Sequence, residues 1–417
     1  MKVLKASKTW KLNYGAVLIA ETLAISGFAL SMPVIPLFLV DEIGIDDPGL
    51  LKLWTGVIQS CTSVALAVFA PIWGRLADIY SRRAMLMRAM FGGAIIVSAM
   101  ALVNSPWQLL VLRVMQGCLT GTIAAASVLT VGIVPQHNLT MALGLLQTGI
   151  YVGNSLGPLA GGLLTDFLGH RAAFLGTGII LLMAGFIVFK GVQEERRGVN
   201  SGSINGQAKN TGGLLAGFKK IASNPEVMLL LTVSFLFQMS NTTANPIMPL
   251  FLREITADSQ YIGSSTGFVI GLGAVAGAFG SIVSGKFCTR IGHWKTLIIC
   301  LAGGCAGIAQ ALANNLWSLA ALHFIPSFFL GGIGPSLQAL LTEHTDHDHQ
   351  GRVFGLNSSA ASTGAALGPL IGSGAAMLSY RAVFPVTAII LSLPLIALIR
   401  RKNRPAANDS SHSEKQD

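Results

Sequence analysis

Two ionisable side chains, a glutamate and an arginine, stand well inside long apolar stretches of the sequence. Glu21 lies in the stretch near 14–40, and Arg113 lies in the one near 107–131. Placing a charge in hydrocarbon costs at least ~2.5 kcal/mol, so such residues are functional by default. Burial favours the protonated form of a carboxyl group, which makes Glu21 a candidate proton carrier. Arg113 could tune that carboxyl or contact an anionic substrate, whereas the alternative for Glu21 is a hydrogen-bonded structural carboxyl near one membrane face.

Uncharged polar side chains recur at helical spacing in several of the same stretches. An amide or phenol that faces a cavity can hydrogen-bond a substrate, although each is more often a hydrogen bond between neighbouring helices. A largely apolar cavity of this kind would suit lipophilic neutral or cationic compounds. The candidates for lining a substrate cavity are Gln59, Gln116, Gln147, Tyr151, Gln238, Asn241, Asn245 and Asn357.

A run of histidines and acids at 343–349 has the donor types that bind divalent metals. It lies in a loop between two apolar stretches, without the helical spacing that would fix a coordination geometry. We therefore expect a solvated hinge loop and no metal site, with metal binding or pH sensing as the alternative. The residues are Glu343, His344, Asp346, His347, Asp348 and His349.

The composition places these groups in a membrane. The chain has 417 residues, of which 52% are hydrophobic and 11% charged, and its mean hydropathy is +0.63. Soluble domains carry roughly 25% charged residues, so a soluble enzyme is excluded. Segments of about 20 apolar residues span the bilayer as helices. Twelve are predicted, near 14–40, 51–73, 85–104, 107–131, 141–165, 172–191, 226–252, 261–284, 296–314, 317–341, 353–377 and 381–399.

The charges predict the orientation of these spans. With the N-terminus inside, 23 of the 28 lysines and arginines fall at the inner face, and the net charge is +13 inside and −3 outside. Cytoplasmic loops carry such an excess of basic residues. We therefore expect both termini in the cytoplasm and a multi-pass protein of the cell (inner) membrane. The overall charge of +10 then reflects topology, and no nucleic-acid partner is expected.

The two halves of the chain repeat each other at an offset of 210–213 residues. MPVIPLFL at 32–39 recurs as NPIMPLFL at 245–252, and GPLAGG at 157–162 recurs as GPLIGS at 368–373. Parallel repeats of this kind build secondary transporters around a site at the midplane. The offsets place Ser234 opposite Glu21 and His323 opposite Arg113, so the two charged groups belong to one half only.

The repeat and the polar segments predict the domain organisation. We expect an N-terminal six-helix bundle at 1–191, a cytoplasmic linker at 192–225, a C-terminal six-helix bundle at 226–399 and a cytoplasmic tail at 400–417. The linker and the tail are rich in glycine, serine, asparagine and charge, which cannot bury a core.

Three motifs resemble signatures of the major facilitator superfamily, and in particular of its twelve-span drug:proton antiporters. The loop after the second span, from Gly74 to Asp78 with two arginines following, is similar to the first signature. Ile79 departs from the usual basic residue there, and Ser81 departs from the usual glycine. Residues 113–117 resemble the signature of the fourth span, and residues 153–162 resemble the antiporter signature of the fifth.

The resemblance covers 10–400 and implies roles for the motif residues. Within the superfamily, the sequence is similar to bacterial multidrug exporters of the fosfomycin and deoxycholate resistance type. Asp78 would bind Arg352 or the start of the eleventh span and close an inner gate in the outward-open state. The implied gate is Gly74, Arg75, Asp78, Arg82, Arg83 and Arg352, and the implied antiporter motif is Gly153, Gly157, Pro158, Gly161 and Gly162. Glycine and proline in that motif permit close helix approach and a bend.

The sequence thus predicts an all-α membrane protein of twelve helices in two pseudo-symmetric halves, acting as a proton-coupled exporter of small lipophilic molecules. It would work by alternating access, as a monomer in the lipid bilayer, with protons as the driving force and no cofactor. The alternatives are an exporter of a specific metabolite, sugar or siderophore on the same fold and, more remotely, a membrane-embedded lipid enzyme. The enzyme would need a cluster of histidine, aspartate and serine at one membrane face.

Overall fold

The computed structural model describes residues 2–79, 81–192, 224–256, 261–345 and 350–402, and in these ranges the regular secondary structure is helical. Apolar segments in lipid form helices because their backbone groups have no other hydrogen-bond partner. The first half contains α1 (Lys2–Ser31), α2 (Val34–Asp41), α3 (Pro48–Ile79), α4 (Arg82–Met100), α5 (Pro106–Leu119), α6 (Thr122–Ile133), η1 (Gln136–Asn138), α7 (Leu139–Leu168) and α8 (His170–Gly191).

The second half repeats this order of elements. It contains α10 (Pro225–Thr243), α11 (Met248–Ile255), α12 (Ile262–Ile291), α13 (His293–Cys305), η2 (Ala306–Leu312), α14 (Leu316–Gly331), α15 (Ile333–Glu343), α16 (Gln350–Leu378), η4 (Tyr380–Ala382) and α17 (Val383–Lys402). The predicted linker lies mostly at 193–223 and the predicted tail mostly at 403–417, outside the described residues.

The helices agree with twelve membrane crossings. By length and composition, nine helical stretches of the described chain could span a membrane, or ten if α10 and α11, bent by 40° at their junction, form one span. The helices α7 and α16 are 30 and 29 residues long and supply the remaining two crossings. Both are rich in glycine, serine and threonine and pack against helices of the opposite half.

The second span is longer than the sequence predicts. The helix α3 continues to Ile79, so residues 74–79 extend the helix instead of forming the expected loop. No proline follows Pro71 in this segment, and a helix can continue beyond the hydrocarbon edge where water solvates its side chains. The next helix, α4, begins after Ser81, whose side chain accepts a hydrogen bond from the backbone N–H of Ala84 at 3.1 Å. The serine that departs from the family signature is therefore the N-cap of α4.

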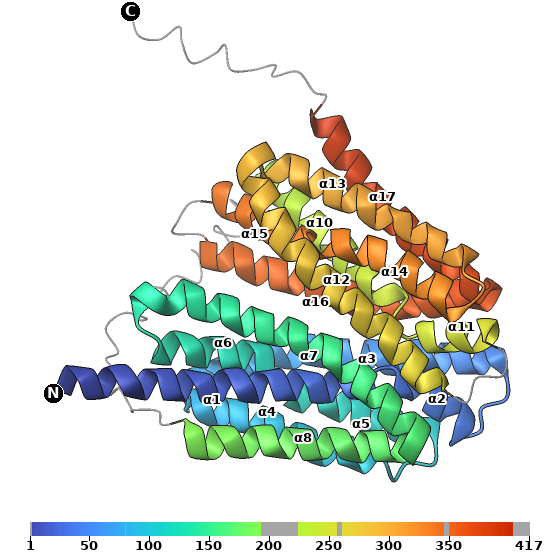
Figure 1. The fold of residues 1–417 in the computed structure, drawn as a ribbon, viewed down its shortest axis with the longest axis horizontal. Coiled ribbons are helices and arrows are strands. Elements are labelled where there is room, and N and C mark those ends of the chain that lie inside the picture. The colour runs from blue at the N-terminus through green and yellow to red at the C-terminus, as the bar shows by residue number, and fades with distance from the viewer. Residues whose placement is uncertain (1, 80, 193–223, 257–260, 346–349, 403–417) are drawn as a thin grey trace, which may run out of the picture.

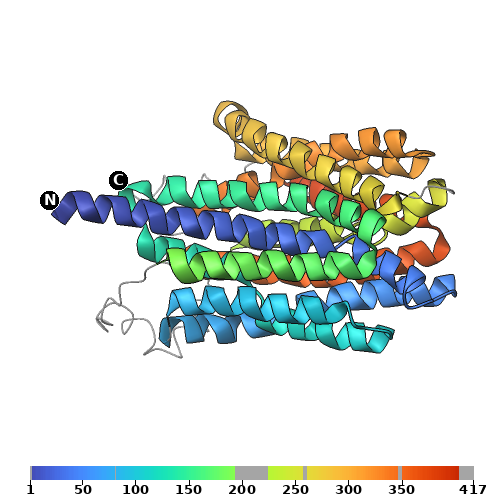
Figure 2. The same cartoon turned by 60° about the horizontal axis from the view of Figure 1, so that its bottom comes forward.

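The two halves lie side by side, and long helices run lengthwise through both (Figures 1 and 2). Within the halves, α1 packs against α7 and α10 packs against α16. Between the halves, α7 packs against α12 and α3 packs against α16. The short helices α2 and α11 contact each other at one end of the molecule, away from the start of α1 (Figure 1). We call this the α2/α11 end.

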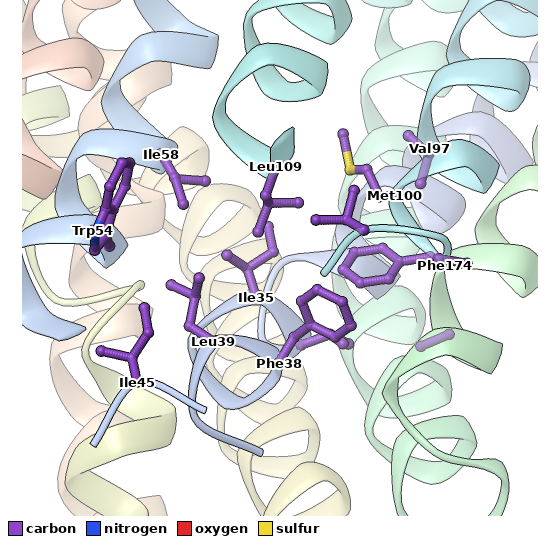
Figure 3. Close-up of a cluster of buried hydrophobic side chains, with 14 of the residues drawn as sticks. Ile35, Phe38, Leu39, Ile45, Trp54, Ile58, Val97, Met100, Leu109 and Phe174 are labelled. Carbon is purple, nitrogen blue, oxygen red and sulfur yellow. The ribbon is translucent and has the colours of Figure 1, made fainter. Parts of the chain in front are cut away.

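A buried apolar cluster supports the α2/α11 end. Figure 3 shows side chains of α2, including Ile35 and Phe38, packed among residues of α3, α4, α5 and α8. The Phe38 ring meets the Phe174 ring edge to face, with centroids 5.2 Å apart. Leu250 of α11 belongs to the same cluster, so the apolar packing continues from the first half into the second.

Candidate transport site

Glu21 is buried on α1 with an exposed fraction of 0%. Neither carboxylate oxygen has a hydrogen-bond partner among the described residues. The Thr122 side chain at the start of α6 approaches the carboxyl group, and the neighbouring α1 residues belong to an apolar cluster. An unpaired charge is strongly unfavourable in such a place. The environment therefore suits a neutral carboxylic acid, and Thr122 is the side chain that could hydrogen-bond it in the alternative of a structural carboxyl.

Arg113 is also buried, on α5, but its guanidinium is held by two amides. It donates to Gln116 Oε1 at 2.8 Å and to Gln59 Oε1 at 2.9 Å. Gln116 is one turn along the same helix, whereas Gln59 comes from α3. Two candidates for the substrate cavity thus bind Arg113 in this structure. The alternative of an interhelical hydrogen bond describes Gln59, whereas Gln116 bonds within its own helix.

Glu21 and Arg113 do not pair with each other in this structure. Arg113 uses its hydrogen bonds on the two glutamines, and both Glu21 oxygens are unbonded among the described residues. The first half thus holds a potential acid and a fixed cation at separate positions. When Glu21 loses its proton, no ion pair with Arg113 compensates the carboxylate charge in this arrangement.

The positions that the repeat offsets give in the second half are both polar. Ser234 is buried on α10. His323, on α14, shares a hydrogen bond of 2.9 Å between its Nδ1 and Gln310 Oε1. A side chain at Gly273 of α12 would overlap the His323 ring, so the glycine makes room for it. Sequence reasoning missed Gln310, although its place in an apolar segment beside a repeat-related histidine could have signalled it.

The other cavity candidates are more accessible. Gln147 and Asn241 are exposed, whereas Tyr151, Gln238, Asn245 and Asn357 are partly buried. Asn357 Oδ1 is itself buried without a hydrogen-bond partner among the described residues. Asn245 lies in the turn between α10 and α11, and the others come from α7, α10 and α16, which are helices of the intra-half and inter-half contacts described above. They can offer amide and phenol groups to a ligand without breaking a salt bridge.

The inner gate falls largely on side chains that the structure does not describe. The side chains of Gly74, Arg75, Asp78 and Arg352 are outside the described set. The backbone places Asp78 at the end of α3 and Arg352 in the first turn of α16.

The two remaining gate arginines contact their own half. Arg82 donates to the carbonyl of Val128 on α6 at 3.3 Å. Arg83 donates to the carbonyl of Phe189 on α8. Both arginines therefore stabilise packing within the first half.

Three glycines of the antiporter motif face α1. A side chain at Gly157 or Gly161 would overlap backbone atoms of α1, and one at Gly153 would lie 2.9 Å from the Thr22 carbonyl oxygen. The same spacing recurs in α16, where Gly364, Gly368 and Gly372 approach the backbone of α10. Close helix contact of this kind requires residues without side chains.

Two other motif residues face the opposite half. A side chain at Gly267 of α12 would overlap the Pro158 carbonyl, and one at Gly162 would overlap the Gly263 carbonyl. One turn further along, Ser155 donates to the Gly271 carbonyl at 3.1 Å. The motif therefore joins α7 to α1 on one face and to α12 on the other.

The second contact between the halves has the same design. A side chain at Gly56 of α3 would lie 2.9 Å from the Pro369 carbonyl oxygen of α16 and would overlap Ser373. The repeat relates Gly56 to Gly267 and Pro369 to Pro158, each at an offset of 211. Two equivalent glycine-on-carbonyl contacts thus hold the halves together.

Polar contacts reinforce the junction at the α2/α11 end. Arg253 of α11 forms an ion pair with Asp41 of α2 at 2.8 Å, and the Lys52 ammonium lies 4.4 Å from the centre of the Tyr380 ring. Asp166 of α7 accepts hydrogen bonds from the start of α12. Sequence reasoning counted the charged members of these contacts for topology only and missed their roles between the halves.

Arg88 is a second basic residue that the sequence reading left out of the membrane. It lies in the second turn of α4, and its guanidinium carbon is 3.5 Å from the centre of the Trp73 ring. Trp73 in turn donates its indole N–H to the Cys118 carbonyl at 2.5 Å. A cation over an aromatic face is stabilised without an acid, which explains how a charge fits at this end of the span.

The histidine-rich loop is described only in part. Glu343 pairs with His293 at 3.1 Å, and His344 Nδ1 lies 2.9 Å from the Leu340 carbonyl oxygen. Residues 346–349 fall outside the described part of the chain. Within that part, no group of three metal-binding side chains comes together.

Sequence comparison relates the chain to a family of transporters. A family model described as "Major Facilitator Superfamily" matches residues 17–310 and 230–416. The relatives include "Multidrug resistance protein MdtG" of Dickeya zeae (strain Ech586), 32% identical over 96% of this chain and 98% of the relative. The protein of the same name from Salmonella typhimurium (strain LT2) is 34% identical over 91% of this chain and 92% of the relative.

Solved structures with the same fold are transporters as well. A mutant of the nucleoside transporter NupG has a TM-score of 0.77 at 12% identity and covers 93% of this chain and 99% of its own. A bacterial homologue of the human lysosomal transporter Spinster, inward-facing and occupied, has a TM-score of 0.74 at 14% identity. It covers 93% of this chain and 96% of its own. At these identities the likeness extends to the fold.

Proposed function

Because this chain belongs to the major facilitator superfamily, we propose that it is a multidrug efflux transporter that exchanges small molecules for protons. Relatives at 32–34% identity over most of the chain are named multidrug resistance proteins, which supports the substrate class. The chain is a multi-pass membrane protein. We place it in the inner membrane with both termini in the cytoplasm, because basic residues gather at that face.

This orientation makes the α2/α11 end the outer end. The ion pair of Asp41 with Arg253, the Asp166 contacts and the apolar cluster around α2 all join the halves there. The arrangement fits a state closed to the outside and open to the cytoplasm. Alternating access then requires these contacts to break while new ones form at the inner end. Asp78, in the last turn of the long helix α3, and Arg352, in the first turn of α16, are the candidates for that inner closure.

The buried Glu21 carboxyl carries the proposal of proton coupling. It sits within a span, with no hydrogen-bond partner among the described residues, so it can gain or lose a proton without dismantling a network. We assign the proton-carrying role to Glu21 and an electrostatic role to Arg113, whose fixed charge lies in the same half. Gln147, Tyr151, Gln238, Asn241, Asn245 and Asn357 are proposed to line the substrate path.

No cofactor is needed for this cycle, since the proton gradient supplies the free energy, and we propose that a monomer carries it out. The test uses the purified full chain in proteoliposomes with an imposed pH gradient and a panel of lipophilic neutral and cationic dyes, beginning with ethidium. We expect uphill movement of at least one compound that stops when an ionophore removes the gradient. If every compound moves as it does in protein-free vesicles, the proposal is wrong.

A further inference from the structure

We propose that Asp166 is the outer gate residue of this transporter, and that its carboxylate holds the start of α12 in the opposite half and keeps the outer end closed. The inference deepens the transport cycle proposed above and rests on it. It assigns a positioning role to a residue outside the antiporter motif and outside the inner gate.

The carboxylate makes several bonds to one helix terminus. Asp166 Oδ1 accepts the backbone N–H of Gly263 at 2.9 Å, and Oδ2 accepts the backbone N–H of Ser264 at 2.7 Å. The Ser264 hydroxyl also donates to Oδ2. The first N–H groups of a helix have no partner within the helix, and the helix dipole favours a negative charge at that end. A carboxylate from α7 satisfies both requirements of the 30-residue helix α12.

The backbone around Asp166 is shaped for this contact. A side chain on Gly263 would lie 2.6 Å from Asp166 Oδ1, and one on Gly162 would overlap the Gly263 carbonyl. Glycine at both positions therefore lets the two backbones approach until the carboxylate reaches the N–H groups. Phe167 and Tyr261 flank the contact with ring centroids 6.2 Å apart. The bonds form only while α7 and α12 are in contact, which makes them sensitive to movement of the halves.

Asp166 contributes more to the stability of the closed outer end than the neighbouring ion pair of Asp41 and Arg253 does. The Asp41 and Arg253 side chains are 35% and 43% exposed, and exposed ion pairs contribute little because water and salt screen them. Asp166 is partly buried and its bonds run to backbone groups held in place by the helix, so less is lost in ordering the partner. Charge-assisted hydrogen bonds are about twice as strong as neutral ones.

The contact is present in one of the two inter-half junctions. At the repeat offset of 211, Met377 of α16 stands where α7 has Asp166, and Lys52 stands where α12 has Gly263. The junction of α3 with α16 is supported instead by Lys52 over the Tyr380 ring. The carboxylate contact that closes the outer end is therefore made between α7 and α12. Asp78, at the opposite end of the molecule, also lies in the last turn of a long helix and would reach the start of α16, so both gates would use a carboxylate on a helix N-terminus.

The test measures the distance between the outer ends of the two halves. Leu102 and Leu312 are related by the repeat and are 76% and 73% exposed at those ends, so Leu102→Cys and Leu312→Cys can carry spin labels. The full chain, with its five native cysteines replaced by alanine, is compared with Asp166→Asn and Ser264→Ala by double electron–electron resonance. Asp47→Asn is the matched control, because Asp47 accepts from Leu50 N–H at 2.7 Å within its own half.

We expect Asp166→Asn to raise the ratio of the population at long spin-label distance to the population at short distance about tenfold. This is the effect of losing one hydrogen bond to a charged group. Ser264→Ala, which removes one donor and keeps the charge, should shift it less in the same direction. Asp47→Asn should leave it unchanged. If both variants match the control, the gate assignment is wrong. If the wild-type protein transports nothing but Asp166→Asn still shifts the distances toward the long population, the proposed function is contradicted and the role of Asp166 in outer closure is supported.

Discussion

Replacement of Glu21 by glutamine tests the coupling mechanism most directly. Glutamine has nearly the same size and cannot exchange a proton with the cavity. The carboxylate is in no ion pair of the described structure, and an amide can keep the approach of the Thr122 side chain. We expect the Glu21→Gln protein to fold normally and to bind substrate. We expect it to move substrate in either direction only down the substrate's own gradient.

The expected accumulation follows from the number of buried acids. Glu21 is the one buried carboxyl group among the described residues, so we expect one proton per cycle. A difference of one pH unit is worth ~1.36 kcal/mol per proton, or a tenfold concentration ratio. With a neutral substrate, no membrane potential and a gradient of about 1.5 pH units, the wild-type protein should reach about a thirty-fold ratio, and the variant should stop near equality.

The assay is uptake of a neutral dye into proteoliposomes, with potassium and valinomycin clamping the membrane potential at zero. Counterflow without a pH gradient serves as the control, because exchange of labelled for unlabelled substrate needs no net proton movement and should survive in Glu21→Gln. A variant that still accumulates dye thirty-fold would refute the assignment of Glu21. A wild-type ratio near a thousand-fold would show two protons per cycle and a second carrier.

Three further predictions concern contacts of the described structure. Gln59→Ala leaves one Arg113 donor group without its acceptor, so the free energy of unfolding should fall by about 1–3 kcal/mol. A thermal melt measures this loss, and a loss smaller than that of an exposed-site control would contradict the prediction. Asp41→Arg should weaken outer closure and Arg253→Asp added to it should restore closure by spin-label distances; no rescue would show that the pair does not act as a unit. Gly161→Leu should prevent α7 from packing on α1 and abolish folded protein by size-exclusion chromatography, and a normal profile would refute the packing argument.

The helices of this fold are predictable from the sequence because every apolar segment in hydrocarbon must form a helix to satisfy its backbone hydrogen bonds. The predicted span near 172–191 and the observed α8 differ by two residues at most. The prediction was wrong at the end of the second span, where the chain leaves the hydrocarbon and the membrane no longer requires a helix. Residues 74–79 continue α3 as a helix, although polar residues there suggested a loop.

Contacts between helices were harder to predict than the helices themselves. The types of Gln59 and Gln116 permit either a substrate contact or a hydrogen bond within the protein. Only their distances to Arg113 identify the bond between helices for Gln59 and the bond within α5 for Gln116. Asp166 gave no local signal, because its partners lie 97 and 98 positions away. Glycine spacing in α7 predicted close packing, yet it did not distinguish the face toward α1 from the face toward α12.

The junctions between the halves are built from glycine against backbone carbonyl, at Gly267 on Pro158 and at Gly56 on Pro369. Such contacts use no side chain that could also face a ligand. The exposed amides of Gln147 and Asn241 stand apart from them. Substitutions in the substrate path can therefore alter which compounds are accepted while the moving surfaces stay the same. In an exporter, this separation allows the range of drugs to diversify without rebuilding the switch that moves them.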